Sequence, residues 1–138
     1  MTKNNDPFGE REPLETEEQI DGVQWLELQG LKFTAIPNAT YNPHRSQQAK
    51  NRREGLRPGL SDLLITITAT QAIDNRGHLI FAEMKRIKTF KISDDQKGWS
   101  IVINGLEIPG VEYIFAHGAD ELKDYIRSLL KKVIEYNI

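Results

Sequence analysis

The chain reads Leu79-Ile80-Phe81-Ala82-Glu83-Met84-Lys85 in its middle, an apolar run that ends in an acid and a base. A second apolar run, Leu63-Leu64-Ile65, directly follows a lone acid, Asp62. Side chains at positions i and i+2 of a β-strand point to the same face, so Glu83 and Lys85 should project together. If the run after Asp62 pairs beside them, two carboxylates and an ammonium group converge on one spot.

Two carboxylates at one spot repel each other unless a cation lies between them. Hard oxygen ligands suit Mg²⁺ or Mn²⁺, and a lysine beside the cation can hold a phosphate or a water. The pattern predicts a metal-dependent site for phosphodiester cleavage. There is a plainer explanation, in which Asp62 stabilises a turn and Glu83 pairs with Lys85 on an edge strand. However, an inward-facing carboxylate on so apolar a strand would be costly without a partner.

The length and composition fit one ordinary domain. The chain has 138 residues, of which 38% are hydrophobic and 28% are charged, too few for two comfortable domains. No apolar stretch approaches the roughly 20 residues of a membrane span, and the polar start lacks the apolar core of a signal peptide. The absence of cysteine excludes disulfides, thiolate zinc sites and a cysteine nucleophile. We expect a soluble, cytoplasmic protein with no membrane association.

Basic residues gather on both sides of the acidic site along the chain. The net charge is −2, which argues against a protein that coats nucleic acid through charge alone. One basic cluster would usually be a solvated surface, but two that flank the carboxylates favour contact with phosphates. The predicted DNA-binding residues are Arg45, Lys50, Arg52, Arg53, Arg57, Arg86 and Lys88.

Local patterns predict seven elements in the order helix, three strands, helix, strand, helix. The expected ranges are 15–29, 31–36, 62–69, 78–86, 93–104, 111–116 and a last helix with Asp120 as N-cap and an apolar stripe through Ile134. The turn residues at 74–77 join the second and third strands into an antiparallel hairpin. Residues 39–60 show no periodicity and are expected to form a functional or mobile loop. We predict an α/β fold (an α+β mixed sheet) with a disordered lead at 1–13 and a single domain at 14–138.

At this point the chain resembles a known family, the virus-type replication-repair nuclease domain (VRR-NUC) of the PD-(D/E)XK nuclease superfamily. The resemblance covers nearly everything from Glu15 to the last helix. It rests on Glu15-x-x-x-Gln19, Ile36-Pro37-Asn38, Gly59-Leu60-Ser61-Asp62-Leu63-Leu64, Glu83-Met84-Lys85 and Ser93-x-x-Gln96-x-x-Trp99. The family's usual proline before the aspartate is Ser61 here. The resemblance implies a restriction-endonuclease-like core of order αβββαβα.

The resemblance also implies roles for individual residues. Asp62, Glu83 and the main-chain carbonyl of Met84 would hold Mg²⁺ or Mn²⁺, and Lys85 would be the catalytic lysine. Glu15 and Gln96 would support the site. However, Ser93 with Gln96 is also a capping box, which would explain both residues structurally. Trp99 is more often a core residue than a stacking surface.

The implied activity is that of a Mg²⁺-dependent endonuclease. It would act on branched or junction DNA, such as a Holliday junction, in replication, recombination or DNA repair. Stand-alone domains of this kind resemble homodimeric resolvases, and a phage or viral origin is compatible with the family. Two other classes stay open: an inactive nuclease-fold module that binds DNA or a replication partner, and an RNA-directed nuclease.

Overall fold

The structure is a computed structural model that describes residues 11–37 and 45–135, with only the backbone of Arg45. Residues 1–10 of the expected lead, and Asn38 of the Ile36-Pro37-Asn38 motif, lie outside this part of the chain. The elements are α1 (Glu15–Leu28), β1 (Lys32–Ala35), α2 (Arg45–Arg53), β2 (Leu63–Ile67), β3 (His78–Lys85), α3 (Asp94–Gly105), β4 (Val111–His117) and α4 (Ala119–Arg127).

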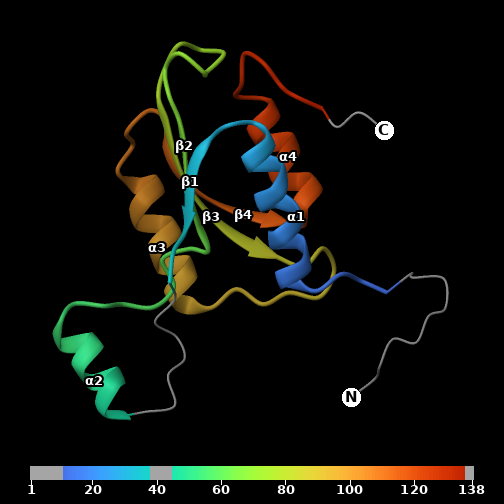
Figure 1. Ribbon diagram of the computed structural model, residues 1–138. Coiled ribbons are helices and arrows are strands. Elements are labelled where there is room, and N and C mark those ends of the chain that lie inside the picture. Colours follow the sequence, from blue (N-terminus) through green and yellow to red (C-terminus); the bar gives the residue numbers. More distant parts are fainter. Residues whose placement is uncertain (1–10, 38–44, 136–138) are drawn as a thin grey trace.

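The strands form one mixed sheet in the order β1-β2-β3-β4. The predicted hairpin is confirmed, because β2 and β3 pair antiparallel with Leu63 opposite Ala82. β3 and β4 pair in parallel, and α3 supplies the crossover that parallel neighbours need. α1 and α4 cover one face of the sheet and α3 covers the other (Figure 1). None of the described helices is both long and apolar enough to cross a membrane.

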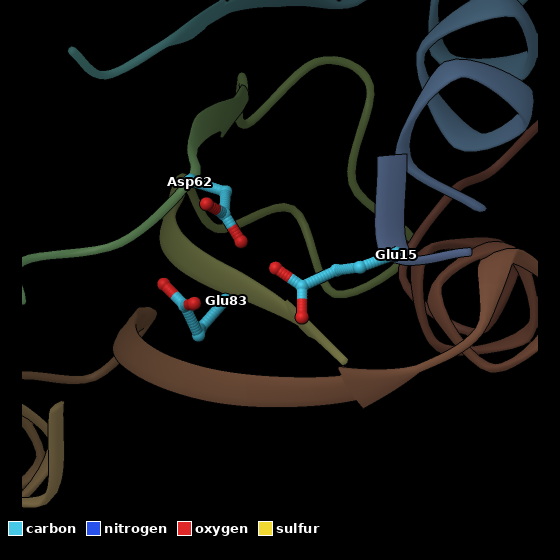
Figure 2. Close-up of side chains that lie close together, drawn as sticks. All are labelled: Glu15, Asp62 and Glu83. Carbon is cyan, nitrogen blue, oxygen red and sulfur yellow. The ribbon is translucent and has the colours of Figure 1, made fainter. Parts of the chain in front are cut away.

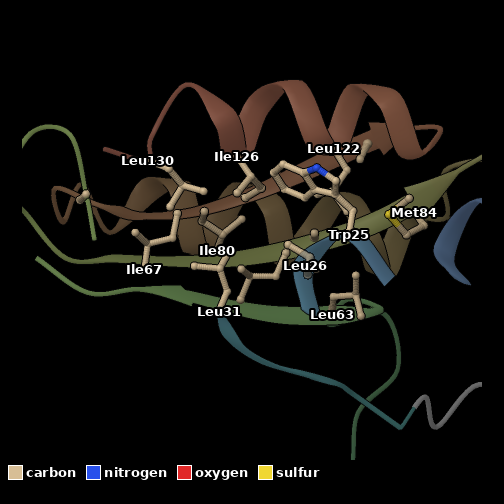
Figure 3. Packing of buried hydrophobic residues seen from close by; sticks show 14 residues of the cluster. Trp25, Leu26, Leu31, Leu63, Ile67, Ile80, Met84, Leu122, Ile126 and Leu130 are labelled. Atoms are coloured by element: carbon tan, nitrogen blue, oxygen red, sulfur yellow. The ribbon is translucent and has the colours of Figure 1, made fainter. Parts of the chain in front are cut away.

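The main core lies between the sheet and the pair α1 and α4. Alternate positions of β2 are fully buried, as the twofold period of a strand requires, and they are Leu63, Ile65 and Ile67. The two helices contribute the large apolar side chains that pack onto this face, namely Trp25, Leu26, Leu122 and Ile126 (Figure 3). This packing fixes α1, whose first residue is Glu15, relative to the strands.

α2 is a helix that the sequence analysis does not predict, since its pattern indicates a loop over residues 39–60. The sequence of α2 is RSQQAKNRR, in which Ala49 is the one apolar residue. A helix that is polar all round has no face to bury, which is why periodicity gives no signal. α2 projects away from the sheet and the other helices (Figure 1). At its C-terminal end, Arg57 Nη1 donates to the carbonyl of Arg52 at 2.9 Å.

The predicted length of the last helix is wrong, because α4 ends at Arg127 and does not continue to Ile134. Beyond it, the carbonyl of Leu129 accepts from the N–H of Ile73 at 2.8 Å, and the N–H of Lys131 donates to the carbonyl of Gln71 at 2.9 Å. Leu130 is thereby buried in an extended bridge to Ala72. The apolar spacing through Ile134 fits a helix, but pairing with the segment before β3 replaces the last turns.

The predicted N-cap of that helix is also wrong. Asp120 has a side chain that is 94% exposed, and the N-cap position is Gly118, whose φ of 92° suits glycine. The N–H of Ala119 donates instead to Glu18 Oε1 on α1 at 3.1 Å. A carboxylate from another helix therefore caps α4 across 101 residues of sequence.

Candidate metal centre

Three acidic side chains meet at one end of the β2–β3 pair. Asp62 immediately precedes β2, and the antiparallel register brings it beside Glu83 on β3. The N–H of Met84 donates to Asp62 Oδ2 at 2.7 Å, which fixes that carboxylate. Glu15, the first residue of α1, reaches toward both from the side (Figure 2). One carboxylate oxygen from each of the three residues lies within 4.8 Å of the others.

The loop before Asp62 is held against the N-terminal end of α3. Gly59 has a φ of +87°, and a Cβ there would lie 2.7 Å from the Cβ of Asp95. Tyr113 on β4 donates its hydroxyl to the carbonyl of Gly59 at 3.2 Å. Because glycine has no side chain, the loop can approach α3 closely at residue 59. This approach brings Asp62 to the site.

Glu83 is the most buried of the three acids, at 2% exposed. Its Oε2 accepts from Gln96 Nε2 at 2.8 Å, while its Oε1 has no hydrogen-bond partner among the described residues. Burial, and then the charge of Asp62, raises the pKa of Glu83 to about 8. Burial and the same neighbour also raise the pKa of Glu15. A buried carboxylate oxygen of this kind, facing two further acids, fits a divalent cation.

Lys85 lies on the same face of β3 as Glu83, as the twofold spacing predicts. Its Nζ is 3.7 Å from Glu83 Oε2. It donates to the carbonyl of Lys91 at 2.6 Å and to Gln96 Oε1 at 2.9 Å. These contacts hold a buried ammonium group beside the three carboxylates.

Gln96 satisfies both explanations that the sequence offers for it. In the capping box, its N–H donates to Ser93 Oγ at 3.2 Å and its Oε1 accepts from the N–H of Ser93 at 3.0 Å. The same side chain bridges Glu83 and Lys85. The structural and the site interpretations are therefore compatible, since the cap aims the amide into the acidic cluster.

The fold that carries this site is similar to that of a known protein. No family model matches the chain, and no curated protein matches it in sequence. A solved structure described as a VRR_NUC domain protein superposes with a TM-score of 0.65 at 19% identity, over 89% of this chain and 93% of that one. The fold is that of a VRR-NUC domain. The expected mixed α/β architecture is confirmed, with α2 as an additional helix between the first two strands.

Within this VRR-NUC fold, Ser61 occupies the place where the resemblance leads one to expect proline. It is buried, and its hydroxyl donates to the carbonyl of Leu63 at 3.1 Å. The side chain thus folds back onto the start of β2, while the carboxylate of Asp62 faces Glu83 and Glu15. Ser61 is not one of the three acidic residues of the cluster, Glu15, Asp62 and Glu83.

The predicted DNA-binding residues fall into two differently placed groups. The exposed residues on α2 are Lys50, Arg52 and Arg53. For Arg45, the structure describes the backbone alone. Arg57 is engaged with the end of α2, through the carbonyls of Arg52 and Leu56. Their contact with DNA stays a prediction.

The second group lies after β3 and is tied to the segment before α1. Arg86 donates to the carbonyls of Pro13 and Glu12 at 2.9 and 3.0 Å. The N–H groups of Lys88 and Thr89 donate to the carboxylate of Glu12. Arg86 is therefore occupied by residues 12 and 13, which the sequence analysis places in a disordered lead, while the side chain of Lys88 is exposed.

Trp99 is a residue whose place the sequence analysis does not foresee. Its residue type favours the core, but it is half-buried and lines a cavity of about 600 Å³. Its Nε1 donates to the carbonyl of Pro58 at 3.0 Å. The available signal is its spacing, because Trp99 lies three residues after Gln96 and so on a neighbouring part of the same helix surface. The carbonyl of Lys91 gives no signal, since a backbone group can be supplied by any residue type.

Proposed function

We propose that this protein is a metal-dependent nuclease that hydrolyses phosphodiester bonds in DNA. The observation that carries the proposal is the convergence of Glu15, Asp62 and Glu83 within 4.8 Å. The ammonium group of Lys85, 3.7 Å from Glu83, completes the set. Carboxylates with an adjacent lysine suit a divalent cation and a phosphate together.

Each residue has a distinct part in the proposed chemistry. Asp62 and Glu83, with the main-chain carbonyl of Met84 and support from Glu15, would hold Mg²⁺ or Mn²⁺. Such a cation polarises a phosphate and increases the acidity of water. Lys85, held by Gln96 and the carbonyl of Lys91, would stabilise negative charge that develops on the phosphate. Gln96 would position Glu83 and Lys85 relative to each other.

The substrate and assembly are further parts of the proposal. The exposed basic side chains of α2 would contact the DNA backbone and position the DNA without reading its sequence. The resemblance to VRR-NUC domains supports branched or junction DNA as the substrate. It also supports a homodimer, whose twofold axis would present two sites to two strands. Sedimentation of the purified protein tests the dimer, and a monomer at working concentrations would remove it.

A cleavage assay tests the proposed activity. Purified protein with Mg²⁺ or Mn²⁺ would be incubated with labelled duplex, single-stranded, flap and four-way-junction DNA, with structured RNA alongside. We expect cleavage of DNA, with branched substrates preferred. Cleavage of RNA alone would favour the RNA-directed alternative, and binding without cleavage would favour the inactive module.

Nearly isosteric variants connect that activity to the site. Asp62→Asn, Glu83→Gln and Lys85→Met should each abolish cleavage, and their effects should not add when combined because they act as one unit. Glu112→Gln is the matched control. Glu112 is a partly buried acid on β4 whose Oε1 also lacks a partner among the described residues, but it lies outside the cluster. Full activity in folded Glu83→Gln would contradict the assignment.

A further inference from the structure

A cavity lined by α3, the helix that also carries Gln96, has the composition of a nucleobase site. It has a volume of about 600 Å³, within the roughly 300–1,000 Å³ typical of small-ligand pockets. Pro58, Trp99 and Val102 supply apolar walls, and Arg52 on α2 supplies a positive charge. The cavity lies between α3 and the stretch from the end of α2 to Pro58.

The aromatic wall is held in place from one edge. The hydrogen bond from Trp99 Nε1 to the carbonyl of Pro58 fixes the indole, and the half-buried ring lines the cavity. An immobilised indole suits stacking by a base, because every base has a π-face. The indole also loses little conformational entropy when the base binds. Asp94 and Asp95 also line the cavity, and their carboxylates can accept hydrogen bonds from the N–H groups of a base edge.

The position of the cavity relates it to the acidic cluster. Gln96 contacts Glu83 and Lys85, and Trp99 follows it by three residues on α3. Such residues lie about 5–6 Å apart between Cβ atoms. A strand whose phosphate lies at the carboxylates would therefore have a neighbouring nucleotide within reach of Trp99.

We propose that this cavity receives the base of one unpaired nucleotide next to the cleaved phosphodiester, an inference that rests on the proposed nuclease function. A base within a duplex is stacked and paired, and must leave the stack to enter a pocket. A base at a branch point is already free of that cost. The cavity would thus select for branched or frayed DNA by capturing a base, with Arg52 contacting an adjacent phosphate.

Binding without cleavage tests this proposal. Fluorescence anisotropy in EDTA would measure the affinity for a labelled flap DNA in which an abasic analogue replaces each unpaired nucleotide in turn. For the wild type we expect one position, next to the branch, at which loss of the base weakens binding by roughly ten-fold, the order expected for one lost stacking contact. If the abasic analogue leaves the affinity unchanged at every position, the proposal is overturned.

Variants connect that effect to the cavity. Trp99→Leu should bind intact flap DNA roughly ten-fold more weakly and no longer distinguish the abasic position, while Trp99→Phe should keep the distinction. Val102→Trp fills the cavity from an exposed position and should also lose the distinction, which keeps the test decisive if Trp99→Leu fails to fold. Ile101→Ala is the matched control, because Ile101 is exposed on the same helix and outside the cavity.

The outcomes separate this inference from the proposed function. If the wild type never cleaves DNA but shows the abasic effect, the nuclease proposal falls, and the cavity remains a base-binding site that is not next to a cleaved phosphodiester. If it cleaves and folded Val102→Trp distinguishes the abasic position as the wild type does, the cavity proposal falls and the nuclease proposal stands.

Discussion

At the scale of single residues, the burial of the Glu83 carboxyl has consequences for stability. A carboxyl whose pKa is raised from 4.5 to about 8 favours folding while protonated. That contribution is complete below about pH 4.5 and is lost as the pH rises through 8. Without metal, the site therefore costs more stability at pH 8 than at pH 5. A cation that binds only the folded state should reverse this loss.

Thermal melts in EDTA and in Mg²⁺ measure this effect. We expect Mg²⁺ to raise the melting temperature more at pH 8 than at pH 5, because the Glu83 carboxyl, whose pKa is raised to about 8, gives up its proton to a cation more readily at the higher pH. Glu83→Gln should melt higher than the wild type in EDTA at pH 8 and respond less to Mg²⁺. An equal response to Mg²⁺ in both proteins would show that Glu83 is not a ligand.

The two contacts of Gln96 can be separated by a pair of substitutions. Ser93→Ala removes the capping hydroxyl and should cost about 0.5–2 kcal/mol of unfolding free energy with cleavage nearly intact. Gln96→Glu keeps acceptors for Lys85 and for the N–H of Ser93, but it replaces the donor to Glu83 with a negative oxygen. It should melt close to the wild type and cleave roughly ten-fold more slowly or worse. Normal cleavage by Gln96→Glu would limit this residue to capping.

At the scale of elements, α4 depends on a cap from α1. Glu18→Ala leaves the N–H of Ala119 without its acceptor and should lower the unfolding free energy by about 1–3 kcal/mol. Glu18→Gln keeps an acceptor oxygen and should lose less. Asp120→Ala is the control, because the side chain of Asp120 is exposed. This substitution should lower the unfolding free energy by at most about 0.5 kcal/mol. Chemical denaturation measures all three, and a larger loss for Asp120→Ala would restore it as the cap.

At the scale of the whole molecule, α2, which carries exposed basic side chains, projects away from the sheet (Figure 1). If they contact DNA phosphates, Lys50→Ala with Arg53→Ala should weaken binding to every substrate. The slope of log affinity against log salt should fall by roughly 1 to 2, since fewer counterions are released. Lys131→Ala with Lys132→Ala removes equal charge from exposed positions after α4 and should leave the slope unchanged. An equal effect of both pairs would indicate a general charge effect.

Much of the sheet and the acidic cluster follows from local pattern. The apolar runs after Asp62 and before Glu83, with turn residues between them, specify a hairpin whose register brings the two acids together. The i and i+2 spacing places Lys85 beside Glu83. These features depend on the twofold period of a strand, which is encoded by neighbouring residues.

Other features depend on partners that are distant in the sequence. Leu130 is not helical, although the apolar spacing predicts a helix there. It forms a bridge to Ala72 instead, and its side chain is buried. Glu18 caps α4, and the carbonyl of Lys91 holds Lys85, through contacts that no local spacing encodes. Periodicity indicates which side chains face inward, but each buried polar group bonds to whichever partner the packed chain brings within reach.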